Sequence, residues 1–277
     1  MEVVITKLHY IPYIGAASGV VGILTSYAIA VSRGDVEPWL PYISDAGGDP
    51  PQSSIFCFSM ILVALCFLVG CCICYLIMVV TNASQNTLVK WLSRLIPLAG
   101  LGCSAGMVLL AINPVGTVRR DGTWLLPIFL PHIIGAVGMF ASGISLMWIL
   151  ALCNYIIDYG AWKPSFYLRC IIATVGIISG ITTIAFCPVH DAQKLAPLPD
   201  STRMYPDGII VSTFSEWVVV LTFMVFTLSF ASEFRKFKLT LKLDYIVDPN
   251  SSRAPLKPAA GSPAETSLKE DPPTPPN

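Results

Sequence analysis

Apolar runs separated by short polar segments dominate the chain from residue 11 to residue 232. A helix needs about 20 apolar residues to cross the hydrocarbon core of a bilayer. The runs therefore predict six membrane-spanning helices, over residues 11–31, 55–80, 95–112, 132–152, 168–187 and 211–232. The fourth run extends back to Trp124, but Pro127 and Pro131 favour a loop or a kinked segment before a helix that begins near His132.

Glycines at four-residue spacing occur in three of these runs, and small residues let membrane helices approach closely. They are Gly15 with Gly19, Gly102 with Gly106, and Gly176 with Gly180. The pattern predicts an all-α polytopic membrane protein, built as a compact six-transmembrane-helix bundle. The first run is longer than the roughly 7 to 15 apolar residues of a cleaved signal peptide, so we expect a retained helix.

Composition supports this class. The 277 residues are 54% hydrophobic and 12% charged, whereas soluble domains average about 45–50% apolar and about 25% charged residues. The formal net charge is zero, so no overall field attracts nucleic acid, and we expect no nucleic-acid partner.

The end of the chain differs from the rest. Residues 248–277 are rich in proline, serine and threonine and cannot build an apolar core. We therefore predict a membrane domain over residues 1–247 and a disordered cytosolic tail over residues 248–277.

Basic residues at the ends of the runs predict the orientation. Lys and Arg are more numerous on the side that holds the N-terminus, the second and fourth loops and the start of the tail. Because cytosolic loops carry the excess of these residues, we expect both termini to be cytosolic.

The first loop, "VEPWLPYISDAGGDPP" from Val36 to Pro51, is rigid because proline fixes its own φ and restricts the preceding residue. One interpretation is a stiff cap over the helix ends, with Trp39 and Tyr42 at the level of the lipid head groups. The other is a preorganised recognition surface in which Asp45 is an exposed carboxylate. The residues of this candidate recognition loop are Pro41, Tyr42, Ile43, Ser44, Asp45, Gly47 and Pro50.

Three segments carry a family resemblance. They are "PYISDAGGDPPQSSIF" in the first loop, "HIIGAVGMFASG" from His132 to Gly143, and "SEWVVVLTFMVFTLSFASEF" from Ser215 to Phe234. Together they resemble the DRAM family, the damage-regulated autophagy modulators, within the wider Frag/DRAM/Sfk group of six-span proteins. The resemblance implies six transmembrane helices in lysosomal, endosomal or plasma membranes, with roles in autophagy, phosphoinositide-kinase recruitment or lipid organisation. It implies no catalytic residue.

Catalytic and metal-binding motifs are not found in the sequence, so we predict neither an enzyme nor a cofactor. Cys71, Cys72 and Cys74 lie within one predicted helix, which splays them in different directions. They are unsuited to a closed metal site, which needs four convergent ligands. Apolar packing is the simplest role for these cysteines, and S-palmitoylation is the alternative.

His132 and Glu216 form a candidate intramembrane polar pair. Glu216 and Glu233 are separated by charge-free sequence shorter than the bilayer core is thick, so one carboxylate is expected at or inside the apolar boundary. Glu233 lies beside Arg235 and Lys236 and can reach water, which leaves Glu216 as the buried one. His132 begins the fourth predicted helix at a comparable depth, and a pair of this kind is a candidate sensor of luminal acidity.

A basic juxtamembrane patch follows the last predicted helix and consists of Arg235, Lys236, Lys238 and Lys242. Its ordinary role is to fix the orientation, and it can also attract anionic lipids. Two functions remain open from the sequence. The first is a non-enzymatic regulator of autophagy or phosphoinositide signalling, with membrane lipids and unidentified proteins as partners. The second is a lipid-handling protein, such as a scramblase, a lipid transporter or a lipid-remodelling cofactor.

Overall fold

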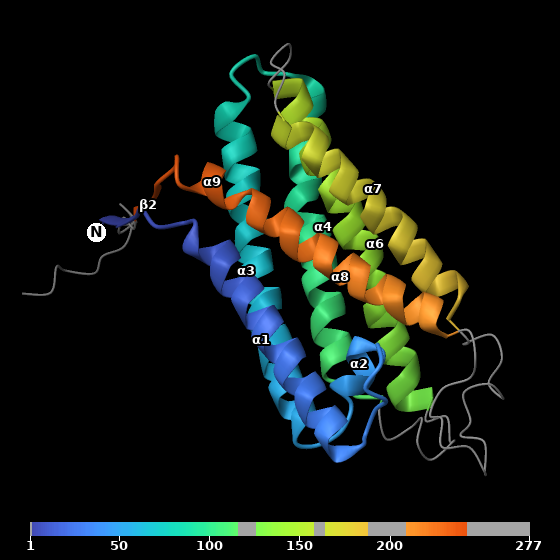
Figure 1. The fold of residues 1–277 in the computed structure, drawn as a ribbon. Helices are drawn as coiled ribbons and strands as arrows, with labels where there is room; N and C mark the ends of the chain where they lie inside the picture. The colour runs from blue at the N-terminus through green and yellow to red at the C-terminus, as the bar shows by residue number, and fades with distance from the viewer. Residues whose placement is uncertain (1, 116–125, 158–163, 188–208, 243–277) are drawn as a thin grey trace, which may run out of the picture. The chain divides into compact units, whose positions relative to one another are not determined.

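The computed structural model describes residues 2–115, 126–157, 164–187 and 209–242 (Figure 1). Within them, six helices are long and apolar enough to cross a membrane. They are α1 (Tyr10–Arg33), α3 (Gln52–Thr81), α4 (Thr87–Ala111), α6 (Leu126–Ile157), α7 (Pro164–Ala185) and α8 (Ile210–Ser229). The prediction of an all-α, six-span membrane protein is confirmed.

Four short elements complete the described structure: α2 (Ile43–Ala46), α9 (Ala231–Phe234), β1 (Glu2–Ile5) and β2 (Leu239–Lys242). The two strands, which the sequence did not predict, pair in a two-stranded sheet. One compact unit, Val4–Thr240, contains all the long helices; the other consists of Met1–Val3 with Leu241–Asn277. The predicted disordered tail, residues 248–277, lies outside the described residues, and the boundary at residue 247 stays a prediction.

The six long helices begin earlier than predicted, and the difference is largest for α4 and α6. α4 begins at Thr87 rather than at residue 95, because the Asn86 side chain caps it by accepting hydrogen bonds from the Leu88 and Val89 backbone amides. α6 begins at Leu126 and contains Pro131, so of the two expectations before His132 the loop is wrong and the kinked segment stays a prediction. Pro127 lies in the first turn, where the amides have no intrahelical partner, whereas Pro131 lies beyond that turn and lacks the amide that would bond to the carbonyl four residues earlier.

Close backbone contact joins α4 to α6, the most extensive helix pairing in the bundle. A Cβ atom on Gly106 would come within 2.6 Å of the Gly135 carbonyl oxygen and of the Met139 amide nitrogen. A Cβ atom on Gly135 would come within 2.7 Å of the Leu110 amide nitrogen. Gly106 therefore has the close-packing role predicted from its spacing, but its partner glycine lies on the facing helix.

The other long helices surround this pair. α1 packs along α3, α3 packs on α4, and α7 packs on α8 (Figure 1). α8 also contacts α1, and its first residues approach α2. We call the side of the bundle that carries α2 and the start of α8 the loop side, and the side that carries α9 the tail side.

Candidate functional site

The first loop binds to the start of α8 through three hydrogen bonds, which together we call the loop–α8 contact. They are Tyr42 Oη to Ser212 Oγ at 2.7 Å, Ile43 N to Glu216 Oε2 at 2.8 Å, and Trp217 Nε1 to Pro41 O at 2.9 Å. Ser212 Oγ then donates to the Thr183 carbonyl at 2.6 Å. The loop is therefore tied to α8 directly and to α7 through Ser212.

Burial changes the interpretation of this loop. Tyr42 and Asp45 are only 4% and 2% exposed, whereas Trp39 is 74% exposed. The expectation that Asp45 is an exposed carboxylate is wrong, because the loop folds inward against the helix ends. Tyr42 is covered by protein, and its depth relative to the lipid head groups stays a prediction. Among the other predicted loop residues, Pro41, Ile43 and Gly47 are buried, Ser44 is half-buried and Pro50 is exposed. The cap interpretation is favoured, and a recognition role stays a prediction.

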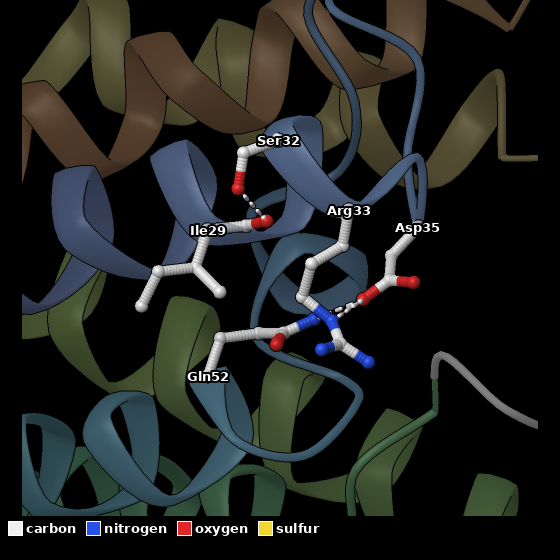
Figure 2. A network of polar contacts seen from close by, with 5 residues as sticks. All are labelled: Ile29, Ser32, Arg33, Asp35 and Gln52. Carbon is white, nitrogen blue, oxygen red and sulfur yellow. Dashed lines mark hydrogen bonds and ion pairs between the residues drawn. The ribbon is translucent and has the colours of Figure 1, made fainter.

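A second polar network fixes the two ends of the same loop (Figure 2). Asp35 Oδ2 accepts hydrogen bonds from Arg33 Nε at 3.1 Å and from Gln52 Nε2 at 2.7 Å. Ser26 Oγ donates to the Gln52 carbonyl at 3.2 Å. The end of α1 is thereby joined to the start of α3. Gly34, with φ of 72°, makes the left-handed turn that ends α1 and places Asp35 for these bonds.

His132 and Glu216 both lie on the loop side and line the same cavity. Nδ1 of His132 lies 3.1 Å from the Leu110 carbonyl and 2.9 Å from the Asn113 carbonyl. Carbonyl oxygens only accept, so Nδ1 carries a proton. Both side chains therefore bond to backbone atoms: His132 to two carbonyls, and Glu216 to the Ile43 amide. A direct hydrogen bond between His132 and Glu216 stays a prediction.

The shared cavity has a volume of about 100 Å³ and lies among α1, α3, α4, α6 and α8. Its polar lining side chains on the loop side are Ser44, His132 and Glu216, and most of the remaining wall is apolar. A second, smaller cavity of about 40 Å³ borders Cys71, Cys74, Phe230 and Phe234.

Arg169 forms a buried clamp on the tail side that the sequence interpretation missed. Its Nε donates to Ser229 Oγ at 3.0 Å, and its Nη2 lies 2.9 Å from Glu233 Oε1. The guanidinium also lies over the Phe230 ring, 3.7 Å from the centroid. Glu233 thus pairs with Arg169 of α7, and its side chain is still 28% exposed. The sequence did contain a signal for this ion pair, because Arg169 and Glu233 lie at the same predicted membrane boundary.

The remaining predicted site residues, the three cysteines and the basic patch, differ in how exposed they are. Cys71 and Cys74 are buried in the core, which disfavours their palmitoylation, while Cys72 is exposed. The four residues of the basic patch are all exposed, and Arg235 Nη2 lies 3.4 Å from Tyr13 Oη. Among the described residues, no group of three His, Cys, Asp or Glu side chains is placed to hold a metal ion.

Six apolar helices, closed on one side by a buried loop, define a polytopic helical membrane protein. The chain belongs to the family described as Frag1/DRAM/Sfk1/Cwh43P N-terminal domain, whose model matches residues 7–237. This confirms the resemblance found in the sequence.

Curated relatives extend the comparison. The chain is 25% identical over 252 residues to DNA damage-regulated autophagy modulator protein 1 of Homo sapiens, covering 86% of this chain and 95% of the relative. It is 25% identical over 226 residues to DNA damage-regulated autophagy modulator protein 2 of Rattus norvegicus, covering 79% and 80%. It is 32% identical over 147 residues to the modulator of macroautophagy TMEM150B of Danio rerio, covering 52% and 57%. No solved structure matches the chain.

Proposed function

We propose that this chain is a non-catalytic regulator of autophagy that acts within a lysosomal, endosomal or plasma membrane. The observation that carries the proposal is similarity over most of the chain to proteins named as autophagy modulators. The geometry is compatible with regulation, because the polar contacts of the bundle join helices and loops to one another.

The mechanism that we propose runs along α8. The loop–α8 contact holds its first turns through Ser212, Glu216 and Trp217. The Arg169 clamp holds its other end through Ser229 and Glu233. A partner that displaces the loop on one side would alter the position of the helix end on the other.

The basic patch is the proposed output of this movement. Lys236 and Lys238 are exposed, while Phe237 and Leu239 between and after them are half-buried against the core. Each cation near an anionic leaflet contributes about 1 kcal/mol of attraction. With both termini cytosolic, the patch would meet phosphoinositides or a protein that binds them, which is how phosphoinositide signalling enters the proposal.

Autophagic flux in cells that lack the protein tests this function. Flux should change on loss and return with the parent chain, but return incompletely with a Tyr42→Phe and Trp217→Phe double variant expressed at the same level. Trp39→Phe is the matched control, because this side chain is exposed. Unchanged flux after loss of the protein would contradict the proposal.

Lipid handling is the second candidate, and the central cavity is the observation that favours it. Purified protein in liposomes that contain labelled phospholipid would distinguish the two functions. Transbilayer movement of the labelled lipid that scales with the amount of protein would support lipid handling. No such movement would favour the regulatory function.

A further inference from the structure

Cationic and aromatic side chains gather where α1 begins, on the tail side of the bundle. We call them the tail-side cluster, which consists of Lys7, His9, Tyr10, Tyr13 and Arg235. Arg235 Nη2 lies 3.4 Å from Tyr13 Oη. The His9 ring centroid lies 4.6 Å from that of Tyr10 and 6.2 Å from that of Tyr13. Lys7 Nζ lies 5.9 Å from the Tyr10 centroid. A continuous series of contacts therefore joins the start of α1 to the residue that follows α9.

The polar groups of this cluster are hydrogen-bond donors whose capacity is largely unused. Among the described residues, the Arg235 side chain bonds to Tyr13 alone, although a guanidinium has five N–H groups. Tyr13 Oη accepts in that bond, which leaves its own O–H to donate. Within the same part of the chain, the Lys7 ammonium contacts the Tyr10 ring alone. The group that complements the cluster is therefore one that accepts hydrogen bonds and carries negative charge.

His9 gives an independent reason to expect a bound group. Its Nδ1 atom is buried and has no hydrogen-bond partner among the residues that the structure describes. Buried polar atoms nearly always have a partner in the protein, in water or in a ligand. Lysine and arginine side chains only donate, so an acceptor placed among them also suits a protonated Nδ1.

The position of the cluster matches the level of lipid head groups. Tyr10 and Tyr13 are 49% and 39% exposed at the start of a helix that is long and apolar enough to cross a membrane. Tyrosine is enriched at membrane–water interfaces, where its ring is in lipid and its hydroxyl near water. Lys236 and Lys238 follow Arg235 and are exposed as well. An anionic head group would thus meet the cluster at its own depth and in positively charged surroundings.

We propose that the tail-side cluster binds a phosphomonoester, with Lys7 and Arg235 as its charged partners and Tyr13 Oη as a further donor. A phosphomonoester carries a charge of about −1.5 to −2 and has three oxygens that accept strongly. A phosphodiester carries less charge and fewer such oxygens. The Glu233 carboxylate does not compete for Arg235, because it is paired with Arg169. The head group of a lipid in the tail-side leaflet and a soluble phosphomonoester both supply this chemistry.

This inference deepens the proposed function and rests on it in one respect, since it names the chemistry that the basic patch would meet. The two can fail separately, because binding is measured on purified protein and autophagic flux in cells. A chain that alters flux without preferring a phosphomonoester would refute the inference alone. A chain that prefers a phosphomonoester without altering flux would refute the proposed function alone.

Native mass spectrometry of the purified full chain in detergent tests the proposal. The chain is titrated with phosphatidic acid, phosphatidylserine or phosphatidylcholine that contain the same acyl chains, and the bound lipids are counted from the mass. Phosphatidic acid carries a phosphomonoester, whereas phosphatidylserine is anionic but carries a diester. The parent chain should bind phosphatidic acid about tenfold more tightly than phosphatidylserine, the effect of one further charge-assisted hydrogen bond. Equal affinity for the two anionic lipids would overturn the proposal.

Substitutions locate the site. Tyr13→Phe removes a donor but no charge, so it should weaken binding of phosphatidic acid severalfold and leave binding of phosphatidylserine unchanged. Lys7→Gln and Arg235→Gln should each weaken binding of phosphatidic acid by about tenfold. Lys90→Gln removes an exposed cation at the start of α4 and is the matched control, which should bind like the parent. Equal affinities of Arg235→Gln and Lys90→Gln would reduce the effect to general charge attraction and overturn the site.

Glycerol phosphate distinguishes the two sources of the phosphomonoester, because it is the head of phosphatidic acid without the acyl chains. If an excess of it leaves phosphatidic acid bound, the site takes a lipid. If it displaces the lipid, the phosphate group alone is recognised and the source is a soluble phosphomonoester. Both results support a phosphomonoester site when Tyr13→Phe weakens the binding, and full binding by that variant would contradict the assigned donor.

Discussion

Trp39 and Trp217 lie near the same loop in opposite surroundings. Trp39 is 74% exposed, whereas Trp217 is half-buried, donates to the Pro41 carbonyl at 2.9 Å and meets the Tyr27 ring edge-on at 6.0 Å. Replacing Trp217 leaves a buried carbonyl without its donor, which costs more than losing an average hydrogen bond.

Trp217→Phe should therefore lower the free energy of unfolding by about 1 to 3 kcal/mol. Trp39→Phe is the control and should change it by less than about 0.5 kcal/mol. Thermal unfolding of the two purified variants in one detergent measures the difference. Equal stability of both variants would contradict the loop–α8 contact.

At the scale of helices and strands, the Arg169 clamp is the contact most open to a quantitative test. Breaking a buried ion pair by removing one partner leaves an uncompensated charge, which costs about 3 to 5 kcal/mol. Arg169 is 2% exposed, whereas the Glu233 side chain is 28% exposed, so this penalty applies to the arginine when the glutamate is removed.

Glu233→Leu should destabilise the bundle strongly, because it leaves the buried Arg169 without its carboxylate. Adding Arg169→Met should restore much of the loss, because the double variant contains no unpaired buried charge. Unfolding of the single and double variants in detergent measures the coupling. Losses that simply add would show that the two side chains act independently.

The α4–α6 crossing gives a steric test. Gly106→Ala places a methyl group against the backbone of α6, which cannot move aside as a flexible side chain can. We expect a loss of folded protein in size-exclusion chromatography. Gly138→Ala, where a Cβ atom meets nothing within 4 Å, should behave like the parent chain. A stable Gly106→Ala variant would mean that the two helices are not in backbone contact.

Orientation is a property of the whole molecule, and the cation bias predicts that both termini are cytosolic. A tag on the C-terminus should therefore react with antibody only after the membrane around the cytosol is permeabilised, and a tag in the first loop should be shielded from the cytosol. Labelling of the C-terminal tag on intact cells would show that the C-terminus is not cytosolic. It would also contradict the proposed cytosolic role of the basic patch.

The sequence predicted the spans well because long apolar runs have few alternatives to a membrane helix. It placed the start of α4 too late because Lys90 and Arg94 interrupt the apolar run although they lie in the first turns of the helix. It missed the burial of Asp45 and the Arg169 clamp for a different reason. Tyr42 and Ser212 are 170 residues apart, and Arg169 and Ser229 are 60 apart. Such contacts depend on how helices pack, which no local pattern encodes.

The central claim for the molecule is that the first loop is bound to α8, so that a loop on one side and a helix end on the other belong to one connected structure. The bond from the Ile43 amide to the Glu216 carboxylate is its most direct expression, at 2.8 Å. An amide held by a charged acceptor exchanges its hydrogen slowly, because exchange requires local opening of that bond.

Hydrogen–deuterium exchange of the peptide that contains Ile43, measured by mass spectrometry in nanodiscs, is the decisive measurement. The parent chain should protect this amide, and Glu216→Ala should accelerate its exchange by about tenfold or more, while peptides from the middle of α4 stay unchanged. Rapid exchange in the parent, at the rate found in the variant, would contradict the account.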